Sequence, residues 1–120
     1  MHKAIAQRGH DHGNAYTRQP VEYYVSPTIV LEGQTPALLS WEANAPPDTA
    51  LKMELRWAAS EAELDGALWQ GPAGRGSFYE RSGDAVRGMP AGACWLQYRA
   101  SYVSMYGRNS PKLREVRFEF

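Results

Sequence analysis

The feature that most constrains this 120-residue chain is an alternation of side chains in Cys94–Ser104. One side of the extended segment carries Leu96, Tyr98, Ala100 and Tyr102, and the other carries Trp95, Gln97, Arg99 and Ser101. Successive side chains of a β-strand point to opposite faces, so this period of two predicts a long strand with one buried face. Its aromatic content suits a half-buried pleated surface, and the 3.6-residue period of a helix is missing. We expect a central strand that the rest of the chain covers.

Five further segments show strand patterns, at 21–25, 28–32, 36–43, 51–57 and 112–120, and turn residues separate them. In the fourth of these, apolar side chains alternate strictly with charged ones, which is typical of an antiparallel sheet with one wet face. A brief apolar run at 85–86 adds another short strand. The pattern therefore predicts an all-β chain folded as an antiparallel β-sandwich of seven or eight strands.

The helical signal of the chain is short. Ser60 and Glu63 have the spacing of a capping box, in which each side chain accepts from a backbone amide of the first turn. Asp65 and Gly66 then end the helix within about two turns. The strand patterns also predict a core drawn from two facing sheets, namely Leu39, Trp41, Met53, Leu55, Trp57, Leu96, Tyr98, Ala100 and Phe118.

Composition excludes several classes of protein. The 13 basic and 13 acidic residues balance, which gives no electrostatic footprint for nucleic acid. No apolar run approaches the roughly 18 residues of a membrane span, and the first ten residues lack the apolar core of a signal peptide. Cys94 is the single cysteine, and its position in the alternation predicts a buried, unreactive thiol. We expect no membrane and no nucleic acid among the partners.

Residues 1–20 form a polar N-terminal arm, followed by a sandwich domain at 21–120. The arm holds the three histidines of the chain and almost no apolar periodicity, so it cannot order itself by burial. We expect it to cross to another subunit or partner and to add to an exposed sheet edge, with Ile5 and Tyr16 as contacts. His10 and His12 flank an aspartate, but two imidazoles and one carboxylate fall short of a structural zinc site, and we predict no metal.

Four local patterns occur in a characteristic order. They are Ser40-Trp-Glu-Ala43, Trp69-Gln-Gly-Pro72, Gly76-Ser-Phe-Tyr79 and Trp95-Leu-Gln-Tyr-Arg-Ala100. Together they resemble a fibronectin-like β-sandwich module of large bacterial surface and secreted proteins, which often lies beside carbohydrate-active domains. The resemblance covers about Tyr24 to Phe120 and implies a fibronectin- or immunoglobulin-like sandwich. It implies little about function, because such modules serve as spacers, glycan binders and assembly units.

Motifs for catalysis are missing. The chain has no Gly-x-Ser-x-Gly and no Gly-Lys-Ser/Thr, and its histidines lie in the arm, which is a poor place for a positioned general base. Paired carboxylates such as Glu61 with Glu63 fit exposed charges at a helix end. We therefore expect no enzyme activity and no cofactor.

Two functions remain. The first is a structural or assembly protein that contacts itself, a scaffold or a capsid protein through the arm and through Val30 and Leu38, which are apolar residues at wet positions. A free-standing module that begins at its own methionine fits a phage virion component, such as a capsid decoration, tail or fibre protein. We therefore expect the chain in a virion or at an extracellular surface.

The alternative is a carbohydrate-binding accessory module. Stacking on a polysaccharide needs exposed aromatic rings with polar neighbours, and Trp69, Tyr79, Trp95 and Tyr106 lie on loops or on the outer side of a strand. Trp95 has two interpretations, because an outward tryptophan can also be covered by the loop that carries Trp69.

Overall fold

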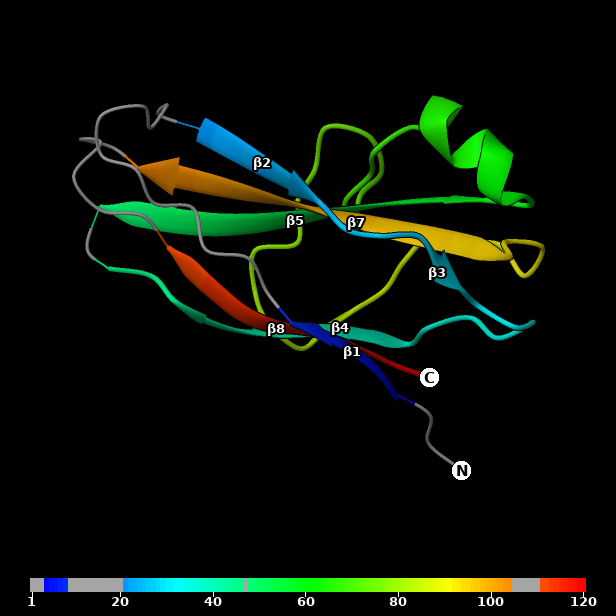
Figure 1. Cartoon of the computed structure of the whole chain (residues 1–120), viewed down its shortest axis with the longest axis horizontal. Helices are drawn as coiled ribbons and strands as arrows, with labels where there is room; N and C mark the ends of the chain where they lie inside the picture. Colours follow the sequence, from blue (N-terminus) through cyan, green and yellow to red (C-terminus); the bar gives the residue numbers. More distant parts are fainter. Residues whose placement is uncertain (1–3, 9–20, 47, 105–110) are drawn as a thin grey trace.

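The computed structural model describes residues 4–8, 21–46, 48–104 and 111–120. These residues form strands and one short 3₁₀ helix, so the predicted all-β fold is confirmed (Figure 1). The strands are β1 (Ala4–Arg8), β2 (Val21–Val25), β3 (Ile29–Val30), β4 (Leu38–Asn44), β5 (Thr49–Ala58), β6 (Asp84–Ala85), β7 (Trp95–Ser104) and β8 (Lys112–Glu119). The helix is η1 (Glu61–Gly66).

The strands build two antiparallel sheets that face each other as layers (Figure 1). Sheet A has the order β1-β8-β4-β6. In sheet B, β5 runs along the whole of β7, and β2 and β3 pair with β7 on its other side. The predicted central strand is therefore confirmed, since β7 pairs with three others.

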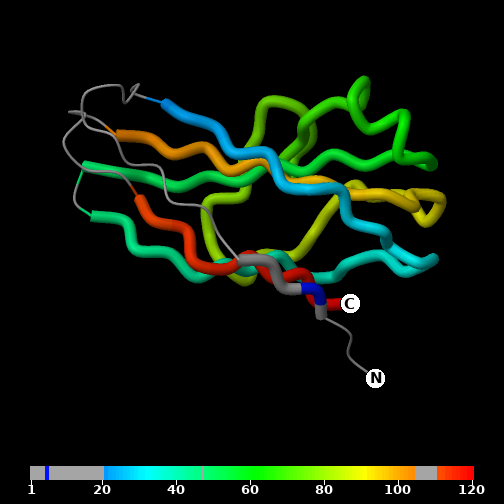
Figure 2. The backbone as a smooth tube through the Cα atoms, viewed as in Figure 1, coloured from blue at the N-terminus to red at the C-terminus, as the bar shows by residue number. Residues whose placement is uncertain are grey.

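The chain changes sheet at every connection from β3 to β8, as the colours of Figure 2 show. Its strand pairs therefore join segments that are far apart in the sequence, such as β4 with β8. The last two strands, β7 and β8, lie in different sheets, whereas the last two strands of an immunoglobulin sandwich share one. The sandwich architecture thus comes with its own connectivity.

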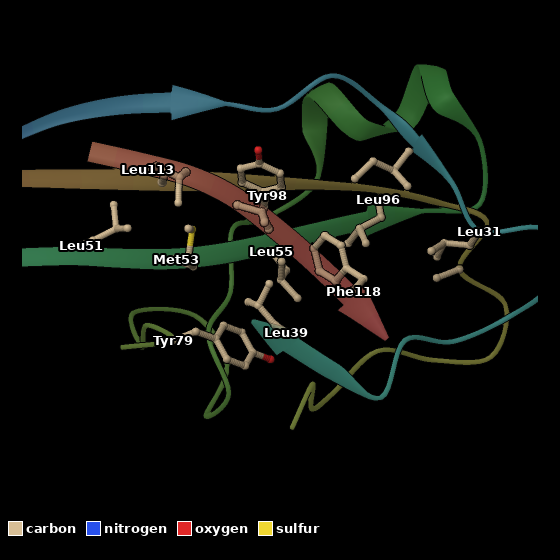
Figure 3. Packing of buried hydrophobic residues seen from close by; sticks show 14 of the residues in the cluster. Leu31, Leu39, Leu51, Met53, Leu55, Tyr79, Leu96, Tyr98, Leu113 and Phe118 are labelled. Carbon is tan, nitrogen blue, oxygen red and sulfur yellow. The ribbon is translucent and has the colours of Figure 1, made fainter. Parts of the chain in front are cut away.

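The core fills the space between the sheets (Figure 3). Seven of the nine predicted core residues are fully buried, namely Leu39, Met53, Leu55, Leu96, Tyr98, Ala100 and Phe118. Trp41 and Trp57 are only partly buried and pack against this cluster from its border. The ring of Tyr98 lies at the centre, 6.3 Å from the ring of Phe118 in the opposite sheet.

The prediction for Cys94 is wrong, because this residue is exposed. β7 begins at Trp95, so the alternation of the strand does not extend to Cys94. Cys94 instead ends the preceding turn, where its N–H donates to the carbonyl of Ala58 (3.0 Å) and its own carbonyl accepts from Leu31 (2.9 Å). The thiol thus lies outside the core.

The prediction that the whole arm leaves its own sandwich is also wrong. Ala4–Arg8 forms β1, which pairs with β8 of the same chain and starts with Ala4 opposite Glu119. Ile5 is half-buried and packs against the core of its own sandwich. The sandwich therefore recruits a strand from before residue 21, because β8 would otherwise present an open edge. Tyr16, His10 and His12 lie outside the described residues.

The predicted capping box does not form. Ser60 is the N-cap of η1, but neither it nor Glu63 makes a side-chain capping hydrogen bond. The helix is a 3₁₀ helix, and the backbone N–H of Glu63 reaches the carbonyl of Ser60 (3.2 Å). Gly66 ends it as expected.

Candidate functional site

The outer face of sheet B carries the main candidate site. The strand registers align Tyr23 of β2 with Ser101 of β7, and Ser101 with Lys52 of β5. The next row joins Val25, Arg99 and Glu54. Because side chains alternate along each strand, these rows all project away from the core.

The charged groups of this face are paired and partly covered. Arg99 donates twice to Glu54 Oε1, at 3.0 and 2.6 Å, and only 4% of Glu54 is exposed. Arg56 donates twice to Gln97 Oε1, at 2.9 and 2.7 Å, and its guanidinium lies 3.7 Å from Asp65 of η1. Both guanidinium groups are therefore fixed in orientation.

Aromatic rings and guanidinium groups alternate along this face in a stack that we call the ladder, Tyr23–Arg99–Trp69–Arg56. The guanidinium of Arg99 lies 4.9 Å from the ring centre of Tyr23 and 4.9 Å from that of Trp69. The guanidinium of Arg56 lies 4.4 Å from the ring centre of Trp69. Each contact is within the range of a cation–π interaction, and together they join β2, β7 and β5 to the loop that carries Trp69.

The loop reaches this position because its backbone is bound to the free side of β5. Gln70 and Leu55 exchange two backbone hydrogen bonds of 2.8 Å, and Tyr79 and Met53 exchange two more of 2.8 Å. These two bridges hold the beginning and the end of the segment between Trp69 and Tyr79. Trp69 is therefore a fixed part of the face.

Gly71 explains why glycine is needed inside this loop. A Cβ atom at Gly71 would lie 2.2 Å from the backbone carbon of Ser77, which no side chain can tolerate. The two sides of the loop can approach each other this closely only because residue 71 has no side chain.

Apolar side chains surround the ladder. Val21, Tyr23 and Val25 are 39%, 54% and 43% exposed on β2, and Leu68 is 53% exposed beside Trp69. Trp69 and Arg99 also line a shallow hollow of about 340 Å³, together with Leu68, Glu54 and Arg75. The face therefore combines fixed polar groups with exposed apolar surface.

The structure describes three of the four predicted glycan-stacking residues and does not place these three on one face. Tyr79 is fully buried, its hydroxyl accepts from the N–H of Arg87 (3.1 Å), and burial raises the pKa of its phenol. The guanidinium groups of Arg56 and Arg99 lie over the ring of Trp69, so this ring is not an open platform for stacking on a sugar. Trp95 is half-buried on the outer face of β7, opposite Val30 and Ala58. Tyr106 lies outside the described residues.

The predicted apolar contacts Val30 and Leu38 are exposed, as expected. They do not share a patch on adjacent strands, because Val30 belongs to sheet B and Leu38 to sheet A. A subunit contact at either residue stays a prediction.

Sequence reasoning missed the ladder. The alternation places Arg56 and Arg99 on the wet side. The position of Tyr23 within 21–25 could have indicated that it lies on the same face. Nothing local indicated that Trp69 would lie over both arginines, because the loop is positioned by bridges to β5.

The described residues include no cluster of three or more metal-ligating side chains and no helix with the length and hydropathy to cross a membrane. Comparisons of the chain with protein-family models, with curated proteins and with solved structures gave no match. The function is therefore argued from the chemistry of the site alone.

Proposed function

We propose that this chain is a non-catalytic structural protein that joins another protein through the outer face of sheet B. The observation that carries the proposal is the exposure of Val21, Tyr23 and Val25, three large side chains on β2, the strand that contributes Tyr23 to the ladder. Monomeric proteins rarely expose contiguous apolar patches of large size, and such patches mark contacts.

The composition of the face supports the same conclusion. Tyrosine, tryptophan and arginine dominate the energetic centres of protein interfaces, and the ladder consists of these three residue types. Because the ladder and its ion pairs are already ordered, little side-chain entropy is lost when a partner binds. Arg99 is hydrogen-bonded to Glu54, and Arg56 is hydrogen-bonded to Gln97. The burial of these side chains under a partner therefore leaves few polar groups unpaired.

The proposal includes the expected context, a component of a virus particle such as a capsid decoration, tail or fibre protein. The partner is then a scaffold or capsid protein or a second copy of the chain. A flat face with fixed anchors suits such permanent contacts better than it suits the capture of a small molecule.

Cross-linking tests the proposal, because lysine occurs at three positions, Lys3, Lys52 and Lys112. Lys52 lies in the row of Tyr23 on sheet B, whereas Lys112 begins β8 in sheet A. We expect an amine-reactive cross-linker, applied to the chain with its native partners, to join Lys52 to another protein chain more often than Lys112. A Tyr23→Ser/Leu68→Ser variant should lose the Lys52 product.

The opposite pattern, with cross-links at Lys112 alone, would contradict the proposal. Binding of a polysaccharide in a glycan array that is lost in a Trp95→Ala variant would favour the carbohydrate-binding alternative.

A further inference from the structure

The loop that covers part of sheet B carries one arginine, Arg75, on an ordered backbone. The N–H of Gly71 donates to the carbonyl of Gly74 (3.0 Å), and the N–H of Gly74 donates back to the carbonyl of Gly71 (3.1 Å). Gly74 and Gly76 flank Arg75 with φ of +96° and +87°, values that residues with a side chain rarely adopt. The two glycines therefore allow a tight turn from which the exposed Arg75 projects.

Ser77 fixes the other side of this turn. Its hydroxyl accepts from the N–H of Ala73 (2.9 Å) and donates to the carbonyl of Gly74 (2.7 Å). Its own N–H also donates to the carbonyl of Gly74 (3.2 Å). Because the backbone is held in this way, only the side chain of Arg75 has to be ordered when a ligand binds, which keeps the entropic cost of binding small.

Arg75 differs from its neighbouring cations in its lack of a partner. Three other cations of the strands in sheet B are each paired with a carboxylate, namely Arg99 with Glu54 (2.6 Å), Arg56 with Asp65 (3.7 Å) and Lys52 with Glu80 (3.4 Å). Within the described part of the chain, Arg75 makes no hydrogen bond, ion pair or cation–π contact. Its guanidinium is therefore available to a carboxylate from another molecule.

The hollow of about 340 Å³ that Arg75 lines also has an apolar part. Its apolar residues are Ala67, Leu68 and Trp69. Leu68 is 53% exposed, so it offers apolar surface that a ligand can cover. The two other charged residues of the lining, Glu54 and Arg99, already neutralise each other. The hollow thus combines one unpaired cation with an apolar wall.

We propose that this hollow binds an aspartate or glutamate side chain of the partner protein, together with a large apolar residue next to it in the partner's sequence. This inference rests on the proposed function and names the chemistry of the partner at this contact. The carboxylate accepts two parallel hydrogen bonds from the guanidinium of Arg75, a geometry that arginine favours. The apolar neighbour packs on Leu68 and removes its surface from water.

A carboxylate fits the hollow better than a phosphate group does. Phosphate groups of nucleic acids and lipids are bound by clusters of several basic side chains, because affinity grows with each added cation. Among the described residues that line the hollow, Arg75 is the one unpaired cation, and the carboxylate of Glu54 lies in the same lining. A single guanidinium balances the single charge of an aspartate or glutamate.

Two capped peptides of the same shape test the site, N-acetyl-Leu-Asp-Leu-amide and N-acetyl-Leu-Asn-Leu-amide. Each is titrated into the full chain, labelled with nitrogen-15, and the backbone amide signals of Leu68 and Gly76 are followed by NMR. The aspartate peptide should bind with a dissociation constant about threefold lower, since an exposed ion pair contributes modestly. The preference should vanish in Arg75→Gln and persist in Arg81→Gln, the matched control, which removes an exposed arginine outside the hollow.

Three results would overturn the inference. The first is the absence of shifts at Leu68 and Gly76 with the aspartate peptide. The second is equal binding of the two peptides, or a preference that survives in Arg75→Gln. The third comes from inorganic phosphate as an additional probe: if it shifts the same signals at a lower concentration than the aspartate peptide does, the hollow recognises phosphate and not a carboxylate of a protein.

Cross-linking separates this inference from the proposed function. With the native partners present, Arg75→Glu should lower the yield of the Lys52 product about fivefold through repulsion of like charges, and Arg81→Glu should change it less than about twofold. An unchanged yield in Arg75→Glu overturns the acidic contact and leaves the contact on sheet B in place. A wild-type chain that gives no Lys52 product overturns the proposed function, whatever the peptides show.

Discussion

The outer faces of the two sheets contain similar residue types in different states. On sheet A, Glu42, Glu115, Glu119 and Arg117 border a shallow hollow of about 270 Å³. The Arg117–Glu115 pair has an N–O distance of 3.1 Å, and its side chains are 48% and 36% exposed. On sheet B, the Arg99–Glu54 pair has an N–O distance of 2.6 Å, and its side chains are 27% and 5% exposed.

The difference comes from the Trp69 loop. It binds to the free side of β5 and covers the charged rows of sheet B, so the same kind of ion pair is held among aromatic rings. Sheet A keeps its charges in water, where an ion pair contributes little. A loop anchored at a sheet edge can thus turn a solvated face into an ordered, partly covered one.

Alkaline pH should produce the largest effect, and it should act through sheet B. Burial raises the pKa of Tyr98 on β7 and of Tyr79, which is bridged to β5, whereas the strands of sheet A contain no tyrosine. The unfolded chain releases these protons near pH 10, so stability is full below pH 10 and falls as the pH rises further. Each pH unit costs about 1.4 kcal/mol for every tyrosine that stays protonated in the folded state. Urea unfolding between pH 8 and 12 measures this slope, and an unchanged slope in Tyr98→Phe would contradict the assignment.

Removal of a carboxylate should distinguish the two faces next. Glu54→Ala leaves the guanidinium of Arg99 among aromatic rings without its partner, and we expect a loss of roughly 3 kcal/mol in the free energy of unfolding. Glu115→Ala on sheet A is the matched control and should cost less than about 1 kcal/mol. Equal losses in urea denaturation would mean that the two pairs are equally solvated.

Loss of the ladder centre should have a smaller effect. Trp69→Leu keeps apolar volume but removes both cation–π contacts, and we expect a loss of about 1–2 kcal/mol. A double-mutant cycle with Arg56→Met should give a coupling energy of about 0.5 kcal/mol or more. Additive effects would show that Trp69 and Arg56 contribute independently.

The smallest effect should appear within the core, where two buried tyrosines differ. Among the described residues, the hydroxyl of Tyr98 has no hydrogen-bond partner, whereas that of Tyr79 accepts from Arg87. At pH 7, Tyr98→Phe should therefore raise the free energy of unfolding by up to about 1 kcal/mol, and Tyr79→Phe should lower it by about as much. Thermal unfolding measures both signs. A clear loss of stability in Tyr98→Phe would reveal a partner for its hydroxyl.

The long strands could be predicted because their side-chain alternation is local. The patterns at 51–57 and 112–120 correspond to β5 and β8, and their inward residues form most of the core. β1 could not be predicted, because a five-residue strand with Ile5 as its one large apolar residue is stabilised by pairing with β8. Cys94 was misplaced since alternation alone does not reveal where a strand begins.

The candidate site could be predicted only in part for the same reason. Alternation places Arg99 on the outer face, but the contact between Arg99 and Trp69 depends on where a distant loop binds. The position of β2 beside β7 likewise depends on the order of strands in the sheet, which no single segment encodes.

The repeated change of sheet along the chain has a consequence for synthesis. β2, β3 and β5 all pair with β7, which begins only at Trp95. A ribosome that adds about 5–20 residues per second therefore exposes three strands for seconds before their common partner emerges. Contacts between such distant segments also make folding slow, on the order of milliseconds to seconds. A nascent chain that ends before Trp95 lacks the centre of sheet B, so this sheet can form only when the last quarter of the chain is made.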